Sequence, residues 1–252
     1  MIGANQLLEY LKRFGPGRSV TFSDGSPRQP VRFPMAAFET HGAVLFADLP
    51  GYSKLASQLT PSECAYLVNH FFAWFEREAG RPYGGMVDKF IGDEVMVVFP
   101  QAGARILPLV AAMQTARALL THDLYGFNPK IGIASGEFAI ALVGTQETAT
   151  VSAMGQVVNL AARCSGSAAA HSVRIATDQL PPVQDVFAGD PWEIRPPELF
   201  EPKHMAPVSV VDVRHTTKWE PTVSYLLEVR EKVREARERG AVSQDRSVLR
   251  ED

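Results

Sequence analysis

Two aspartates next to apolar segments are the first candidates for chemistry in this sequence. Asp48 ends the run AVLFAD (43–48), which is typical of a buried strand. Asp93 lies in DKFIGDEVMVVF, at the tip of an expected hairpin. A single strand-end aspartate usually caps a helix or forms a turn, and Gly92-Asp93 could simply make the turn. Two converging carboxylates repel each other unless a divalent cation lies between them, so the pair indicates a cation site better than either residue alone.

Other polar groups near these segments could bind phosphate. The Gly-containing turn after Asp48 exposes backbone N–H groups that can hold phosphate oxygens. Asn159 and Arg163 in VVNLAARC are spaced i,i+4 on one helical face, where an amide and a guanidinium suit a phosphoryl group. A solvated arginine in a surface ion pair is the alternative. Lys89, on the strand that leads to Asp93, could contact a nucleobase edge. Taken alone, a lysine at this place more often forms an ion pair with a nearby acid.

Alternating strands and helices must position these side chains. Thr60 as N-cap, Pro61 in the first turn and Glu63 three residues on form a capping box, which predicts a helix to about Ala79. The segments MVDKF and EVMVVF predict a β-hairpin around Gly92. The chemistry-bearing residues therefore lie at a strand end, a hairpin tip and a helix.

The remaining segments continue the alternation. The expected elements are a helix over 5–14, a Gly- and Pro-rich loop, a helix over about 102–122, a strand over 130–138, a helix over 155–168, a strand over 172–177, a Pro-rich acidic stretch over 180–206 and an edge strand over 209–213. A charged helix over 225–239 carries Leu226, Val229 and Val233 on one face, so it can dock or dimerise.

The composition is typical of a globular protein. The chain has 252 residues, of which 46% are hydrophobic and 21% are charged, and this excludes wholesale disorder. Its 25 Lys and Arg against 28 Asp and Glu give a formal net charge of −3, which is too balanced for a protein that coats nucleic acid. Any phosphate chemistry must therefore be local.

Cysteine spacing and hydropathy bear on the compartment. Cys64 and Cys164 lie far apart, in expected helices, without CxxC or Cys/His metal spacing. No stretch approaches the roughly 18 apolar residues of a membrane span, and the N-terminus lacks a signal-peptide pattern. We expect a cytoplasmic protein with neither a membrane nor a nucleic-acid partner.

Four segments, in this order, resemble the catalytic domain of class III nucleotidyl cyclases: LFADLPGYSKL, GGMVDKFIGDEVMVVF, KIGIASGEF and VSAMGQVVNLAAR. The resemblance covers about residues 43–213 and implies an α/β fold with an α+β ferredoxin-like βαββαβ core. It implies an enzyme that makes a 3′,5′-cyclic nucleotide. The expected organisation is an N-terminal helix and loop (1–42), a catalytic domain (43–214), and a C-terminal helix and disordered tail (215–252).

The resemblance also implies a role for each candidate residue. Asp48, Asp93 and the backbone carbonyl of Leu49 would hold two divalent cations, Mn²⁺ or Mg²⁺, that act in the in-line displacement of pyrophosphate. The implied substrate-binding and catalytic set comprises the amides of Gly51, Tyr52 and Ser53 for the β- and γ-phosphates, Lys89 and Ser152 for the base, Lys203 for a phosphate, Asn159 for the ribose and Arg163 for the transition state.

Two subunits are implied for each site. In the family, one protomer supplies the cation ligands and the other supplies the base, ribose and transition-state residues, so the resemblance implies a head-to-tail homodimer with two shared sites. Two positions depart from the family pattern. Ser152 stands where adenylate-forming relatives commonly have Asp or Thr, and Gln156 stands where the helix usually begins with Asp.

The base remains open on hydrogen-bond chemistry. Lys89 only donates, whereas the Ser152 hydroxyl can donate or accept, so the pair could read adenine, cytosine or uracil, with guanine least favoured. In build the chain resembles the free-standing bacterial pyrimidine cyclases of anti-phage defence, which favours UTP, or CTP, and an effector reached through cyclic UMP or cyclic CMP.

Three alternatives compete with this prediction. They are an adenylate cyclase that makes cyclic AMP, a non-catalytic cyclase-like domain that binds nucleotide and dimerises, and a phosphodiester-forming relative with a GGDEF-type hairpin. The sequence FIGDEV at the hairpin tip disfavours the last of these.

Overall fold

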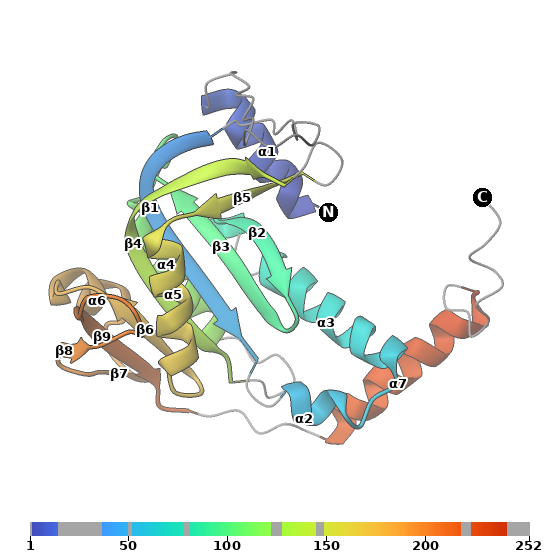
Figure 1. Ribbon diagram of the computed structural model, residues 1–252. Coiled ribbons are helices and arrows are strands. Elements are labelled where there is room, and N and C mark those ends of the chain that lie inside the picture. The colour runs from blue at the N-terminus through green and yellow to red at the C-terminus, as the bar shows by residue number, and fades with distance from the viewer. Residues whose placement is uncertain are drawn as a thin grey trace.

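A computed structural model of the chain describes residues 2–14, 37–49, 52–77, 81–121, 128–144, 149–217 and 223–240 (Figure 1). Its strands are β1 (Ala37–Asp48), β2 (Met86–Ile91), β3 (Glu94–Pro100), β4 (Lys130–Val143), β5 (Thr150–Met154), β6 (Ser172–Ala176), β7 (Trp192–Ile194), β8 (Glu198–Phe200) and β9 (Val208–His215). Its helices are α1 (Ile2–Phe14), α2 (Tyr52–Ala56), α3 (Pro61–Phe75), the 3₁₀ turn η2 (Arg81–Tyr83), α4 (Pro108–Thr121), α5 (Gln156–Ser167), α6 (Leu180–Val186) and α7 (Val223–Glu238).

The strands form one mixed sheet with a recognisable core. Their order is β2-β3-β1-β4-β6-β9-β7, with β5 beside β4 and β8 beside β9. The first four strands pair antiparallel as β4-β1-β3-β2, with α3 leading from β1 to β2 and α4 leading from β3 to β4. The expected ferredoxin-like βαββαβ core is therefore confirmed. β6 extends it parallel to β4 after the connecting helix α5.

Strand β1 is the central element of this core. β3 and β4 pair with its two edges, and residues 43–47 are almost fully buried. Alternate side chains enter two separate cores, since Leu45 and Ala47 face one and Val44 and Phe46 face the other. The apolar run that predicted a buried strand is thus explained by burial on both faces.

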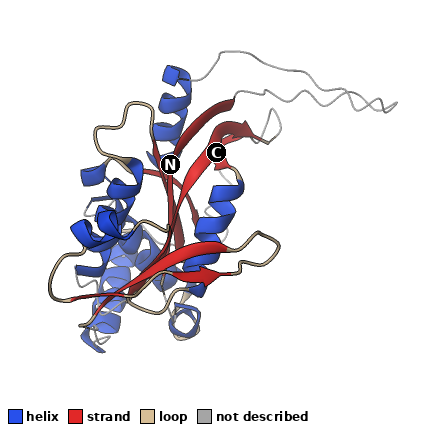
Figure 2. Ribbon diagram, turned by 90° about the vertical axis from the view of Figure 1, so that its left-hand side faces the viewer, coloured by secondary structure: helices blue, strands red, loops and turns tan. Residues whose placement is uncertain are grey.

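Helices cover both faces of the sheet (Figure 2). One core combines strand side chains with α3, α4, α6 and α7, and the other combines them with α1, α5 and β5. α7 also packs along α3 (Figure 1). The C-terminal helix, which was predicted to dock or dimerise, docks on its own chain, because Val229 and Val233 on its apolar face are buried.

Most predicted elements are present with shifted ends. The Thr60 capping box is confirmed, with the Thr60 N–H donating to Glu63 at 2.7 Å. α3 spans Pro61–Phe75, and Ala79, where its end was predicted, lies outside the described residues. The helix expected from 102 begins at Pro108, because turns occupy residues 101–106. The strand expected over 43–48 begins at Ala37.

One topological prediction is wrong. Residues 209–213 were expected to form a final edge strand, but β9 pairs with β6 on one side and with β7 and β8 on the other. The Pro-rich stretch 180–206 contains α6, β7 and β8. Two strands of three residues are too short to show an alternating pattern, so the covering of β9 was not predicted.

The loop after the first helix, over 15–36, and the tail over 241–252 lie outside the described residues. None of the described helices is long and apolar enough to cross a membrane. Both cysteines are free thiols, and Cys164 is buried against the sheet side of α5.

Helix α5 is held unusually close to the sheet at Gly132 in β4. A Cβ atom at this position would lie 2.1 Å from the Ser165 backbone nitrogen and 2.2 Å from the Ala161 carbonyl oxygen. Both neighbours are helix backbone, which cannot move away as a flexible side chain can. The absence of a side chain at Gly132 therefore sets how deeply α5 sits on β4.

We expect Gly132→Ala to destabilise the protein by about 2 kcal/mol or more, because overpacking against backbone forces the helix off the sheet. Gly136→Ala in the same strand is the matched control, since its Cβ would meet only Val157 side-chain atoms at 3.6 Å, an ordinary contact. Urea unfolding of both variants measures the difference. Equal stability of the two variants would contradict the close packing of α5.

Candidate active site

Three carboxylates gather where β1 ends and the β2–β3 hairpin turns. The antiparallel register of β1 and β3 places Asp48 beside Glu94, one step beyond their last paired residues. Gly92, at φ +65°, and Asp93 form the two-residue hairpin loop directly before Glu94. All three carboxylates are half-buried. The structure thus brings the two predicted aspartates together and adds a third acid.

The pKa values of two of these groups record their crowding. Burial raises the pKa of Asp93 to about 6, and the charge of Asp48 and a hydrogen bond with its carboxyl add to the rise, against an opposing backbone hydrogen bond. Burial also raises the pKa of Glu94 to about 7, where the charges of Asp48 and Asp93 contribute and a hydrogen bond with Ser165 opposes. The ionised cluster is therefore short of positive charge.

This cluster fits divalent cations that share their ligands with a substrate. Carboxylate and carbonyl oxygens are the hard donors that Mg²⁺ and Mn²⁺ prefer. No three acidic, His or Cys side chains in the described part of the chain are arranged as a complete metal cage. A site with one or two carboxylates is typical of Mg²⁺ bound together with substrate phosphates, so the Asp48–Asp93 pair suits that use.

The turn after Asp48 is only partly described. Leu49 is buried, and its carbonyl oxygen accepts a hydrogen bond from the Tyr52 N–H at 3.2 Å. The carbonyl predicted to bind a cation and one amide predicted to bind phosphate thus bond to each other here. Ser53 is exposed in the first turn of α2, whereas Gly51 lies outside the described residues. The charge of Asp93 contributes to a raised pKa of Tyr52, mainly caused by burial, so this turn lies near the cluster.

A second polar cluster joins β2 to β5. The Lys89 ammonium donates to the Ser152 hydroxyl oxygen at 2.5 Å, which brings the two predicted base-binding residues into direct contact. Asp88, whose side chain is fully buried, accepts from the Ser152 hydroxyl at 3.0 Å and from the Ala153 N–H at 2.6 Å. Its carboxylate also lies 3.1 Å from the Lys89 ammonium.

A β-bulge explains how Asp88 and Lys89 reach the same neighbour. Val87 pairs with Val97 and Lys89 pairs with Met96, so Asp88 is the extra residue on β2. A bulge interrupts the alternation of side chains between the two faces of a strand. Asp88 and Lys89 can therefore both contact Ser152 although they are adjacent in sequence.

The predicted ribose and transition-state residues make no hydrogen bond or ion pair with these clusters in the described part of the chain. Asn159 and Arg163 are both exposed on α5, whose other side packs through Val157 and Ala161 against the sheet. Within the residues that the structure describes, neither side chain makes a hydrogen bond or an ion pair. One chain by itself therefore does not bring them to the Asp48–Asp93 pair.

Lys203 is also remote within one chain. It is exposed in the turn between β8 and β9, and the sheet order puts β9 three strands away from β1. Nothing near Lys203 in the described ranges tests its predicted contact with a phosphate.

Sequence reasoning missed two acids of the candidate site, Asp88 and Glu94. The signal for Asp88 was an acid inside the otherwise apolar start of MVDKF, directly before the candidate Lys89. The signal for Glu94 was a second acid immediately after Asp93 at the hairpin tip. Each of these acids directly neighbours a candidate residue, so the sequence alone does not distinguish its role from that of its neighbour.

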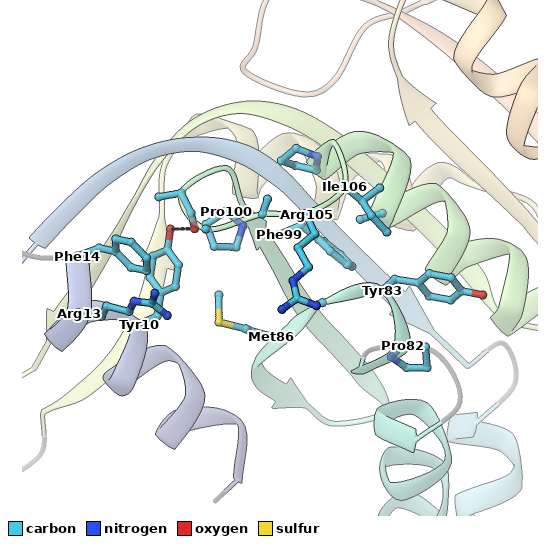
Figure 3. Close-up of a pocket in the computed structure, with 16 residues that line it drawn as sticks. Tyr10, Arg13, Phe14, Pro82, Tyr83, Met86, Phe99, Pro100, Arg105 and Ile106 are labelled. Carbon is cyan, nitrogen blue, oxygen red and sulfur yellow. Dashed lines mark hydrogen bonds between the residues drawn. The ribbon is translucent and has the colours of Figure 1, made fainter.

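A cavity of about 430 Å³ lies near the opposite end of the sheet, between α1, η2 and the end of β3 (Figure 3). The guanidinium groups of Arg13 and Arg105 lie on either side of Met86, and the Tyr10 hydroxyl donates to the Ala102 carbonyl at 2.9 Å. Its lining contains no carboxylate. This cavity therefore lacks the carboxylates that a divalent-cation site uses, and the candidate site is the cluster at the hairpin tip.

Comparison with known proteins gives one family. The family model for the adenylate and guanylate cyclase catalytic domain matches residues 37–182. The uncharacterized protein Rv1319c of Mycobacterium tuberculosis is 28% identical over 162 residues, which are 63% of this chain and 30% of that protein. The chain thus spans under a third of the length of this curated relative.

Solved cyclase structures share the fold. The adenylyl cyclase CyaB from P. aeruginosa superposes with a TM-score of 0.61 at 22% identity, covering 70% of this chain and 95% of that chain. The guanylyl cyclase Cya2 superposes with a TM-score of 0.56 at 22% identity, covering 74% of this chain and 96% of that chain. The fold predicted from the four motifs is confirmed by these similarities.

We expect the metal-free protein to lose stability as the pH rises from about 5 to 7.5, because the folded-state pKa values of Asp93 and Glu94 are raised. Raised carboxyl pKa values mean that the folded state binds these protons more tightly, so their stabilising effect is present at low pH and is lost as the pH passes through about 6 to 7. Thermal unfolding should show a smaller pH effect in Glu94→Gln, and Mn²⁺ should raise the melting temperature of the wild type at pH 7.5.

The matched control is Glu201→Gln, which alters an exposed acid outside the cluster. It should keep the wild-type pH dependence. An identical pH dependence in the wild type and Glu94→Gln would show that the folded state does not raise the pKa of Glu94.

Proposed function

Because the chain belongs to the adenylate and guanylate cyclase catalytic domain family, we propose that it converts a ribonucleoside triphosphate into a 3′,5′-cyclic nucleotide and pyrophosphate. The observation that carries the proposal is the Asp48–Asp93 pair, in which burial first, and the charge of Asp48 in addition, raise the pKa of Asp93. The same hairpin carries Lys89, in contact with Ser152. Carboxylates for cations and a donor–acceptor pair for a base are the parts that such a reaction needs.

The carboxylates would act through two divalent cations, Mn²⁺ or Mg²⁺. Such cations, when bound, neutralise the triphosphate and activate the ribose 3′ hydroxyl for in-line attack on the α-phosphorus. Asp48 and Asp93 would hold them from the strand end and the hairpin tip, with the Leu49 carbonyl as a further ligand. The rigid pairing of β1 with β3 keeps these two carboxylates at a fixed separation.

The remaining roles follow the predicted assignments. Lys89 and Ser152 would bind the base edge, and Gly51, Tyr52 and Ser53 would bind the β- and γ-phosphates through their amides. Lys203 would contact a phosphate. These assignments are supported by the Lys89–Ser152 contact and by the position of Tyr52 near Asp93.

The site would be completed by a second copy of the chain. Asn159 and Arg163 are exposed on α5 without partners in the described residues, which is the state expected of groups that act on a site in another subunit. In a head-to-tail homodimer they would orient the ribose and stabilise the charge that develops on the phosphate. Each dimer would then have two equivalent shared sites.

We favour a pyrimidine substrate, UTP or CTP, whose cyclic product would act on a separate effector protein in anti-phage defence. Ser152, in place of the acid or threonine common in adenylate-forming relatives, supports this choice. ATP is the second candidate, since the matching family includes adenylate cyclases. The two free cysteines fit a reducing cytoplasm as the place of the reaction.

Purified protein given equal UTP, CTP, ATP and GTP with Mn²⁺ should release a cyclic pyrimidine nucleotide, identified by mass. Asp93→Asn should lower turnover by more than about 100-fold, because even groups outside the ligand shell can cost 10- to 100-fold. Glu201→Gln is the control. A pool dominated by cyclic AMP would replace the pyrimidine proposal, and nucleotide binding without any cyclic product would identify a non-catalytic domain.

Complementation tests the shared site. Asp93→Ala and Arg163→Ala are each expected to be inactive, but their mixture should regain activity, because a mixed dimer contains one site with neither substitution. Random exchange would make half of the dimers mixed, each with one of two sites intact, so about a quarter of the wild-type activity is expected. No recovery after demonstrated subunit exchange would show that each chain builds its site alone.

A further inference from the structure

Asp88 is the most completely bonded acid near the proposed base site. Its side chain is fully buried, and three donors surround it: the Ser152 hydroxyl, the Ala153 N–H and the Lys89 ammonium. A buried carboxylate is stable only when such donors satisfy it. The β-bulge in β2 places Asp88 at that position. Regular pairing of β2 with β3 would not need the extra residue.

The hydrogen bond to Asp88 fixes the direction of the Ser152 hydroxyl. A hydroxyl has one proton, and an ionised carboxylate can only accept. The Ser152 hydroxyl has two acceptors within reach, the Asp88 carboxylate at 3.0 Å and the Ala153 carbonyl oxygen at 3.3 Å, and the closer, charged carboxylate is the stronger one. With its proton on Asp88 and Lys89 donating to its oxygen, Ser152 has only a lone pair left to offer to a ligand. Lys89 is partly exposed, at 41% of its side chain, and has a third N–H to offer.

We propose that Asp88 is the positioning residue that determines base specificity, by holding Ser152 as a hydrogen-bond acceptor beside the Lys89 donor. The proposal rests on the proposed function, since it assumes that a nucleobase binds there. The Lys89–Ser152 pair then presents one donor and one acceptor at fixed positions. A base is selected when its own donor falls at Ser152 and its own acceptor falls at Lys89.

Asp88→Asn tests this because it changes the direction of the bonds and hardly changes the volume. The amide oxygen can still accept from the Ala153 N–H, and the amide NH₂ then donates to Ser152, so the serine proton turns toward the base. Lys89 and Ser152 are then both donors, whereas the base edge offers one acceptor and one donor, so the base donor is left without an acceptor. The unpaired group costs about 1–3 kcal/mol, equivalent to about 5- to 150-fold in kcat/KM for the preferred nucleotide.

The informative readout is the ratio of kcat/KM between the preferred nucleotide and the others. Nucleotides that do not place a donor at Ser152 lose less, so this ratio should fall by about 5-fold or more in Asp88→Asn. A purely structural role would lower all nucleotides together and leave the ratio unchanged, which would overturn the proposal. Asp212→Asn is the control and should keep the ratio. It neutralises a partly buried acid on β9 that pairs with Arg174 on β6.

Ser152→Ala keeps the proposal testable if Asp88→Asn does not fold. It leaves the bonds of Asp88 to Ala153 and Lys89, so the ratio should fall as in Asp88→Asn, and an unchanged ratio would contradict the proposal. The double variant should discriminate no less than Ser152→Ala alone, since Asp88 acts through Ser152. A further fall in the ratio would show that Asp88 acts by another route.

Binding of 3′-deoxynucleoside triphosphates separates failure of this inference from failure of the proposed function. These probes lack the attacking hydroxyl, so calorimetry reports base preference even if the wild type turns over no nucleotide. Absence of turnover would then refute the cyclase activity. A wild-type binding preference that survives in Asp88→Asn would refute the role of Asp88.

Discussion

Burial of β1 on both faces is the constraint on which the candidate site depends. Its backbone groups pair with β3 and β4, and its alternate side chains fill two cores, so residues 43–47 have no room for a charge. Asp48 lies at the end of β1, where the strand emerges from between the two hydrophobic cores. The register with β3 then puts the hairpin tip, with Asp93 and Glu94, at the same end. The repelling carboxylates are therefore held together by the stability of the core and not by any attraction between them.

The two polar clusters on the hairpin differ in how their charge is satisfied. At the tip, burial and like charges raise the pKa values of Asp93 and Glu94, so the ionised cluster is incomplete without a cation. On β2, Asp88 has three donors and needs nothing further. An unsatisfied cluster is suited to binding a ligand, whereas a satisfied one is suited to fixing the direction of its neighbours. The proposed division of roles, with cation binding at the tip and base selection on β2, rests on this difference.

Sequence patterns predicted the features that depend on local chemistry. The Thr60 capping box, the Gly92 hairpin loop and the apolar run of β1 all have short-range signals, and together with the motifs they predicted the βαββαβ core. The motif pair Asp48 and Asp93 was also found. What could not be predicted depends on distant contacts or broken periodicity. The bulge at Asp88 breaks the alternation of β2, the three-residue strands β7 and β8 carry too little pattern to be seen, and the contact of Glu94 with Ser165 joins elements far apart in sequence.

The central claim is that the core holds Asp48 and Asp93 as a cation site that a second copy of the chain completes. Anomalous scattering from crystals grown with Mn²⁺ and 3′-deoxyuridine triphosphate tests it most directly. The account predicts manganese bound between Asp48 and Asp93 of one protomer, with the Arg163 side chain of the neighbouring protomer on the triphosphate. Manganese bound away from both aspartates, or a nucleotide-bound dimer in which Arg163 faces solvent, would contradict it.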